Sequence, residues 1–97
     1  MLSIIVPCKN EEEAIPLFYP VLKENLDKMN VEYELLIVDD GSTDKTVEVS
    51  LELKEKDPNI KVISFSRNFG KEAGMLAGMK EAKGDYVVVM DADLQDP

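Results

Sequence analysis

Histidine is absent from this 97-residue sequence, and cysteine occurs once, as Cys8. Without histidine, neither a cysteine–histidine catalytic pair nor a histidine-ligated metal site can be built from this chain. A lone cysteine cannot form an intramolecular disulfide, which favours a reducing compartment. Because Cys8 follows an apolar run and Pro7, we expect it to be a buried, unreactive thiol.

Basic residues are also scarce. The sequence has 11 lysines and arginines against 20 acids, which gives a formal net charge of -9. Such a chain has too few cations to neutralise a row of phosphates, so nucleic-acid binding is disfavoured. If a phosphate group binds, a metal ion must supply much of the positive charge. Most of the acids are expected to lie on a solvated surface.

Long apolar runs are missing as well. No stretch approaches the roughly 20 apolar residues of a membrane-spanning helix, and the first residues lack the basic flank of a signal peptide. We therefore expect a cytoplasmic chain with no membrane span. Its length and 44% hydrophobic content suit one small domain.

Apolar runs alternate with helix-forming segments along the chain. Four runs rich in β-branched residues predict strands, the last of them buried, at residues 2–6, 33–38, 60–65 and 86–90. Helices are predicted between them at residues 21–29, 46–56 and 70–82. Pro7 ends the first strand in this prediction, and Pro16 and Pro20 make the turns before residue 21 irregular. This order indicates an α/β fold, a Rossmann-like parallel sheet with right-handed crossovers.

Polar side chains and glycines give finer expectations for the helices. Asn10 is a candidate N-cap of the first helix, and Ser42 or Thr43 of the second. For Asp44, capping is the favoured interpretation. The third helix has a bare stripe formed by Gly70, Gly74 and Gly78. Charged neighbours argue against dimerisation in a membrane, so close approach of this helix to the sheet is expected.

Each predicted strand ends in a polar segment, and ligands of parallel sheets bind at the carboxyl ends of the strands. These segments are residues 7–11, 39–44, 66–70 and 91–97. Asp39 offers a fixed carboxylate for a base or ribose, and the turn at Asp40 and Gly41 lets backbone approach a ligand. Arg67, the single guanidinium of the sequence, suits either a phosphate or a neighbouring acid, and both interpretations stay open.

Asp91 and Asp93 follow the fourth strand with one residue between them. Side chains at this spacing point to the same side of an extended chain, so the two carboxylates can converge. Converging carboxylates repel unless a cation lies between them, and a hard divalent ion is the usual solution. Such an ion can hold a diphosphate. Neither a P-loop nor a Gly-x-Gly-x-x-Gly run is present, so carboxylates, backbone and metal would have to bind a nucleotide.

Taken together, these segments resemble the family 2 glycosyltransferases, whose nucleotide-diphospho-sugar transferase fold is known as GT-A. The matching stretches, which extend from residue 3 to residue 97, are SIIVPCKNEE, LLIVDDGSTDKT, SRNFGKEAGMLAG and GDYVVVMDADLQDP. The last stretch contains a DxD motif. Its ending, DADLQDP, is most similar to the branch that transfers sugars to polyprenyl phosphates, the bactoprenol glucosyltransferases and dolichol-phosphate mannose synthases.

The resemblance implies a metal-dependent enzyme that moves a sugar from a UDP- or GDP-linked donor to a lipid phosphate with inversion. It implies that Asp91, Asp93 and Gln95 bind Mg²⁺ or Mn²⁺. The residues that it implies for nucleotide-sugar binding are Pro7, Asn10, Glu11, Asp39, Asp40, Arg67, Lys71, Asp91 and Ala92. No catalytic residue is assigned within the chain.

Residues 1–97 are then expected to form the nucleotide-sugar-binding part of a longer glycosyltransferase domain, because the family needs a further stretch for the acceptor. The chain alone should bind donor without catalysing transfer, and it should self-associate through an exposed sheet edge. The full-length protein is expected at the cytoplasmic face of the membrane, in cell-envelope biosynthesis.

Two other classes remain open on the sequence. A sugar-nucleotide nucleotidyltransferase also uses paired carboxylates, but it should have a loop rich in glycine and arginine where residues 7–11 are acidic. The second class is a non-catalytic α/β binding or interaction module. The identities of the sugar, the nucleotide and the acceptor stay open.

Overall fold

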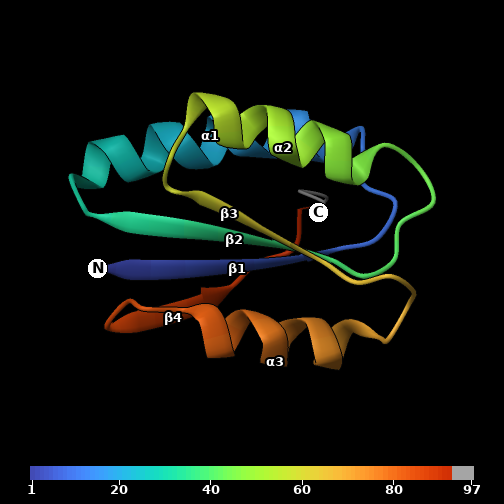
Figure 1. Cartoon of the computed structure of the whole chain (residues 1–97). Helices are drawn as coiled ribbons and strands as arrows, with labels where there is room; N and C mark the ends of the chain where they lie inside the picture. Colours follow the sequence, from blue (N-terminus) through green and yellow to red (C-terminus); the bar gives the residue numbers. More distant parts are fainter. Residues whose placement is uncertain (93–97) are drawn as a thin grey trace.

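The computed structural model describes residues 1–92 as a parallel four-stranded sheet with helices on both faces (Figure 1). The strands are β1 (Leu2–Cys8), β2 (Tyr33–Asp39), β3 (Ile60–Ser64) and β4 (Tyr86–Val89). The helices are α1 (Ala14–Met29), α2 (Thr46–Lys56) and α3 (Lys71–Glu81). The predicted α/β fold with alternating strands and helices is confirmed.

The strand order is β3-β2-β1-β4, and every pairing is parallel. The chain builds the sheet outward from β1 to β3, and then α3 carries it back so that β4 pairs with the other side of β1. The order therefore changes between β1 and its neighbour β4. In open α/β sheets, a crevice at the carboxyl ends of the strands forms at this point.

Two separate cores cover the two faces of the sheet. Helices α1 and α2 lie on one face and α3 alone lies on the other (Figure 1). The larger core joins the buried side chains of Phe18, Leu22 and Leu26 in α1 to alternate strand residues. The smaller core, under α3, is centred on Ile5, Leu36 and Val38. Burial of a large aliphatic or aromatic side chain stabilises the fold by about 1.5–3 kcal/mol.

Helix α3 approaches the sheet closely through its glycines, as the stripe predicted. A Cβ atom on Gly78 would lie 2.6 Å from Cγ2 of Ile5, and one on Gly74 would lie 3.6 Å from Cγ1 of Val38. Gly70 precedes the helix with a φ of 99°, in the left-handed region that favours glycine. None of the helices in residues 1–92 is long and apolar enough to cross a membrane.

The prolines of the N-terminal half are better tolerated than predicted. Helix α1 begins at Ala14 and contains Pro20, so the predicted start at residue 21 was wrong. Pro16 lies in the first turn, where a backbone amide has no partner within the helix, and Pro20 removes one hydrogen bond. Strand β1 continues through Pro7 to Cys8 because the pairing with β4 ends at Ile5 and Val89, before the proline.

Strand β4 is exposed, which contradicts the prediction of a buried strand. The exposed fraction of its residues falls from 74% at Tyr86 to 37% at Val89. The strand lies at the edge of the sheet, and α3 packs mainly against β1 and β2. A continuous apolar run indicates a strand covered on both faces, but it does not say which element covers it.

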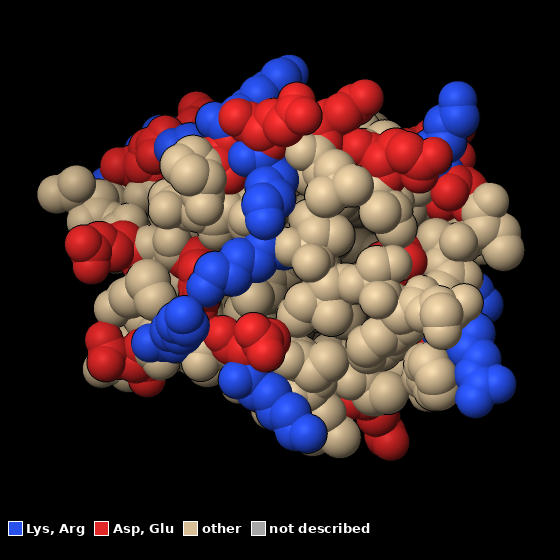
Figure 2. All heavy atoms as spheres, viewed as in Figure 1, with Lys and Arg blue, Asp and Glu red and all other residues tan. Residues whose placement is uncertain are grey.

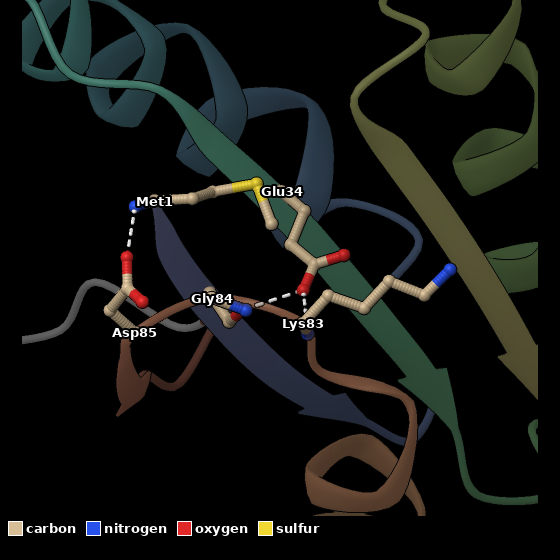
Figure 3. Close-up of polar contacts among 6 residues, drawn as sticks. Met1, Glu34, Lys83, Gly84 and Asp85 are labelled. Carbon is tan, nitrogen blue, oxygen red and sulfur yellow. Dashed lines mark hydrogen bonds and ion pairs between the residues drawn. The ribbon is translucent and has the colours of Figure 1, made fainter.

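A buried carboxylate ties the start of β4 to the sheet at the amino ends of the strands, opposite their carboxyl ends (Figure 3). Glu34 of β2 accepts hydrogen bonds from Oγ of Ser3 at 2.6 Å, from Nζ of Lys61 at 2.8 Å and from the backbone N–H of Lys83. Burial raises the pKa of Glu34, but these donors outweigh burial and lower the pKa to about 2. The connection between α3 and β4 is therefore anchored to the start of β2, an inner strand of the sheet.

Candidate functional site

A pocket of about 210 Å³ opens at the carboxyl ends of the strands, where the strand order changes. We call it the strand-end pocket. It is lined by the last two residues of β1, by residues that follow β1, β2 and β4, and by the first residue of α3, namely Pro7, Cys8, Lys9, Glu11, Asp40, Lys71 and Asp91. Segments far apart in the sequence thus meet at one place, as the polar strand ends indicated.

Five residues of the predicted nucleotide-sugar set line this pocket. They are Pro7, Glu11, Asp40, Lys71 and Asp91. Cys8 and Lys9 line it too, although no role was predicted for them. Both lie in segment 7–11 at the end of the first predicted strand, and this position was the signal that could have identified them. Asn10, Asp39, Arg67 and Ala92 are not among the lining residues.

The clearest electrostatic feature of the pocket is an ion pair between Lys71 and Asp91. Nζ of Lys71 lies 2.9 Å from Oδ1 of Asp91, and the two side chains are 59% and 64% exposed. Asp91 therefore has a cation bound to it already. Asp93 and Gln95, the other predicted metal ligands, lie outside the described residues. Within residues 1–92, no three acids or cysteines gather closely enough to hold a metal by themselves.

Asp40 is buried and positions the start of α3. Its carboxylate accepts hydrogen bonds from the backbone N–H of Phe69 at 2.7 Å and of Gly70 at 3.0 Å. Because Lys71 follows directly, Asp40 also fixes the backbone from which the lysine side chain extends. Gly41 has a φ of 72°, and a Cβ there would lie 2.4 Å from the carbonyl carbon of Arg67. The backbone at Gly41 thus packs against the Arg67 loop.

Asp39 is almost inaccessible, with 2% of its surface exposed. Its carboxylate accepts hydrogen bonds from the backbone N–H of Ser42 at 3.3 Å and from Oγ of Ser64 at 3.4 Å. Ala92 is equally buried and belongs to the larger core. Neither side chain lines the pocket.

Asn10 links two loops and does not cap α1. It has a φ of 56°, its N–H donates to Oγ of Ser42 at 2.8 Å, and its Oδ1 accepts from the N–H of Thr43 at 2.9 Å. The predicted caps at Asn10 and at Ser42 or Thr43 were therefore wrong. Asp44 fulfils its predicted capping role only in part: the N-cap of α2 is Lys45, and the carboxylate of Asp44, one residue earlier, accepts from the N–H of Thr46 at 2.9 Å. The competing loop contacts could not be read from local sequence.

Arg67 is exposed beside the pocket, and its guanidinium lies 5.0 Å from the ring centre of Phe69. This is a cation–π distance. Among residues 1–92 it forms none of the ion pairs, so the pairing with a neighbouring acid finds no support in this part of the chain.

Cys8 is buried, as predicted. Burial, followed by the negative charges of Glu11 and Asp39, raises the pKa of the thiol to about 12. Its Sγ donates to the carbonyl oxygen of Val6 at 3.4 Å. Acidic and basic side chains both occur over α1 and α2, at the top of the view in Figure 2.

Comparison with known proteins decides the family. The model of the family described as Glycosyl transferase family 2 matches residues 3–97. The chain belongs to this family. Among its relatives, the glycosyltransferase YkcC of Bacillus subtilis (strain 168) is 50% identical over 95 residues, which are 98% of this chain and 29% of YkcC. The prophage bactoprenol glucosyl transferase homolog of Escherichia coli (strain K12) is 44% identical over 96 residues, 99% of this chain and 31% of the relative.

Solved structures of glycosyltransferases share the fold. A mannosyltransferase from Pyrobaculum calidifontis, solved in complex with GDP-Man and Mn²⁺, superposes with a TM-score of 0.81 at 28% identity over 95% of this chain and 27% of that one. The sheet and helices of this family 2 chain are therefore those of the N-terminal part of a GT-A glycosyltransferase. The chain spans less than a third of the length of these relatives.

Proposed function

We propose that this family 2 chain forms the donor site of a metal-dependent, inverting glycosyltransferase. The donor would be a UDP- or GDP-linked sugar, and the acceptor a polyprenyl phosphate. The observation that carries the proposal is the strand-end pocket, in which the Asp91 carboxylate and the Lys71 ammonium meet at the change of strand order. A relative named for bactoprenol and a neighbour solved with GDP-Man and Mn²⁺ support the same chemistry.

The residues at the end of β4 suit a hard divalent cation. The carboxylate of Asp91 faces the pocket and already has the Lys71 ammonium as a stand-in cation. Asp91, Asp93 and Gln95 would hold Mg²⁺ or Mn²⁺, because hard cations prefer carboxylate and amide oxygens. When bound, the ion neutralises negative charge on the diphosphate leaving group.

The remaining predicted site residues differ in how deeply they are buried. Pro7 and Glu11 line the pocket and would contact the nucleoside, whereas Asp40 holds the start of α3 in place. Asp39 is buried, so its contact with a base or ribose would need its outer carboxylate edge to become accessible. Asn10 and Arg67 would contact the donor from the rim of the pocket. The buried Ala92 would contact it through its backbone.

The proposed reaction is a single displacement at the anomeric carbon. An oxygen of the acceptor phosphate forms the new bond to that carbon, and the bond to the diphosphate oxygen breaks with its electron pair leaving on the nucleoside diphosphate. An acceptor phosphate is already ionised, so it needs no strong general base. The residues that bind the acceptor are not assigned within this chain, which would bind donor without transferring sugar by itself.

A lipid-phosphate acceptor would place the whole enzyme at the cytoplasmic face of a membrane, in cell-envelope biosynthesis. Within this proposal, residues 1–97 are the nucleotide-sugar-binding part of the glycosyltransferase domain. The relatives' greater length is consistent with this division.

Thermal unfolding tests the donor site directly. UDP-glucose or GDP-mannose should raise the Tm by several degrees at about 100 times its Kd, and only with Mn²⁺ present, because a ligand of the native state adds about 2.7 kcal/mol at that excess. Asp91→Asn and Asp93→Asn should abolish the shift. Asp27→Asn, an exposed acid on α1, is the matched control and should keep it. If neither sugar nucleotide raises the Tm of the unmodified chain, the proposal fails.

A further inference from the structure

We infer that Lys71 is an exchangeable cation of the strand-end pocket. Its ammonium group neutralises Asp91 while no metal is bound, and it moves to the diphosphate when a divalent ion takes Asp91. This inference rests on the proposed function and deepens it, because it gives Lys71 opposite effects on the two ligands of the site.

The ion pair is of a kind that exchanges easily. The side chains of Lys71 and Asp91 are both more than half exposed, although Nζ and Oδ1 are 2.9 Å apart. Exposed ion pairs contribute little to stability, because water screens the charges and because two long side chains lose conformational entropy when they are held in one geometry. A divalent ion with twice the charge can therefore displace the ammonium from Asp91.

The backbone beneath Lys71 is fixed while its side chain is free to reorient. The N–H of Gly70 donates to the buried carboxylate of Asp40, and Gly74 packs on Val38 one turn later. Lysine has a flexible four-carbon stem, so its ammonium can change partners without any movement of α3. The exchange thus needs only side-chain rotation.

The positive charge of Lys71 should weaken the binding of a divalent ion and strengthen the binding of a diphosphate. An ammonium group held at Asp91 repels a divalent ion that approaches the same carboxylate, since both are positive. A nucleoside diphosphate reverses the situation, because its oxygens offer the displaced ammonium an anionic partner beside the metal. Asp40, which also lines the pocket, already accepts from two backbone N–H groups. Glu11, the third carboxylate of the lining, has a single charge, so the more highly charged diphosphate is the second partner in this proposal.

The test measures the two ligands separately in Lys71→Met. Binding of Mn²⁺ alone is followed by the loss of the electron paramagnetic resonance signal of the free ion, and binding of UDP and GDP at saturating Mn²⁺ by calorimetry. In Lys71→Met, Mn²⁺ alone should bind about three- to tenfold more tightly and the diphosphate about three- to tenfold more weakly. Lys71→Arg should restore both affinities to within about twofold, since it keeps the charge.

Lys80→Met is the matched control, because Lys80 is exposed near the other end of the same helix. It should leave both affinities unchanged. Equal Mn²⁺ affinities in the unmodified chain, Lys71→Met and Lys80→Met would overturn the exchange and leave the proposed metal site standing. A chain in which neither the unmodified form nor Lys71→Met binds Mn²⁺ would overturn the metal site itself, and with it the exchange. Tighter Mn²⁺ without weaker diphosphate would also reject the exchange.

Discussion

At the scale of single residues, the buried carboxylates of this chain hold loops in place. Asp40 binds the backbone before α3, and Glu34 binds the backbone before β4. Each acid is paired with donors, as the cost of burying a charge requires. The same residue type therefore serves structure when buried and remains available to ligands when exposed, as at Asp91.

Glu34 should make the stability of the fold depend on pH. Its pKa in the folded chain is about 2, below the ordinary value of 4.5, so the unfolded chain binds more protons between these values. Glu34 therefore stabilises the fold above pH 4.5, and this contribution disappears as the pH falls toward 2. A shift of this size corresponds to about 3 kcal/mol in the free energy of unfolding.

Urea unfolding of Glu34→Gln at several pH values measures this contribution. The variant should lose about 2–3 kcal/mol at pH 7 and should differ less and less from the unmodified chain between pH 4.5 and 2. Glu52→Gln, an exposed acid on α2, should change the free energy of unfolding by less than about 0.5 kcal/mol. A difference between Glu34→Gln and the unmodified chain that stays constant with pH would show that the charge is not the cause.

At the scale of elements, α3 links the sheet to the pocket. Its glycines set how closely the helix lies on β1 and β2, and Lys71 at its first position reaches Asp91. Added side-chain volume on the sheet-facing side of α3 must be absorbed by Ile5, which is fully buried, or by movement of the helix. Gly74 and Gly78 lie one turn apart, so the same substitution at each position measures how much added volume the contact with the sheet tolerates.

Gly78→Ala should destabilise the chain by about 1–3 kcal/mol in urea unfolding, because overpacking at Ile5 exceeds the gain in helix propensity. Gly74→Ala is the matched control. Its new methyl group would meet Val38 and Pro7 at ordinary contact distances, so the variant should be neutral or more stable by up to about 1 kcal/mol. Equal effects of the two substitutions would mean that the distance between α3 and the sheet is not set at Gly78.

The elements were predictable where local patterns act alone. The bounds of α2 were predicted correctly, and α3 differs by one residue at each end, because helical periodicity is a property of the local sequence. The start of α1, the continuation of β1 and the exposure of β4 were mispredicted. Each of these depends on a neighbour: the position of Pro16 in a turn, the point where β4 stops pairing, and the place of β4 at an edge.

The sequence predicted where the site lies better than it predicted which of its residues contact one another. The alternation of strands and helices brings the polar strand ends together, and five predicted residues line the pocket. Sequence could not show that Asp40 faces the α3 backbone, or that Lys71 pairs with Asp91, 20 residues away. Such pairings depend on the final strand order and on the rotation of each side chain.

At the scale of the whole molecule, the free edge of the sheet at β4 combines unpaired backbone groups with exposed apolar side chains. Tyr86, Val87, Val88 and Val89 are all at least 37% exposed. β4 pairs with β1 on one side, and within residues 1–92 no strand pairs with its other side. The N–H of Met90 donates to the carbonyl of Ile5, so by strand alternation the N–H groups of Val87 and Val89 point to the free edge. An edge with unpaired backbone groups and apolar side chains is a template for a second copy.

We therefore expect the 97-residue chain to self-associate through β4, as judged by light scattering after size-exclusion chromatography. Because each chain has a net charge of -9, association should strengthen from about 0.05 to 0.5 M salt, as repulsion is screened over a shorter distance. Val87→Lys places a charge on the edge and should shift the chain to monomer. Leu17→Lys, the same kind of change at a 71% exposed site on α1, should leave association intact. A chain that remains monomeric at high salt and millimolar concentration would show that the β4 edge does not pair with itself, and equal loss of association in both variants would place the contact elsewhere.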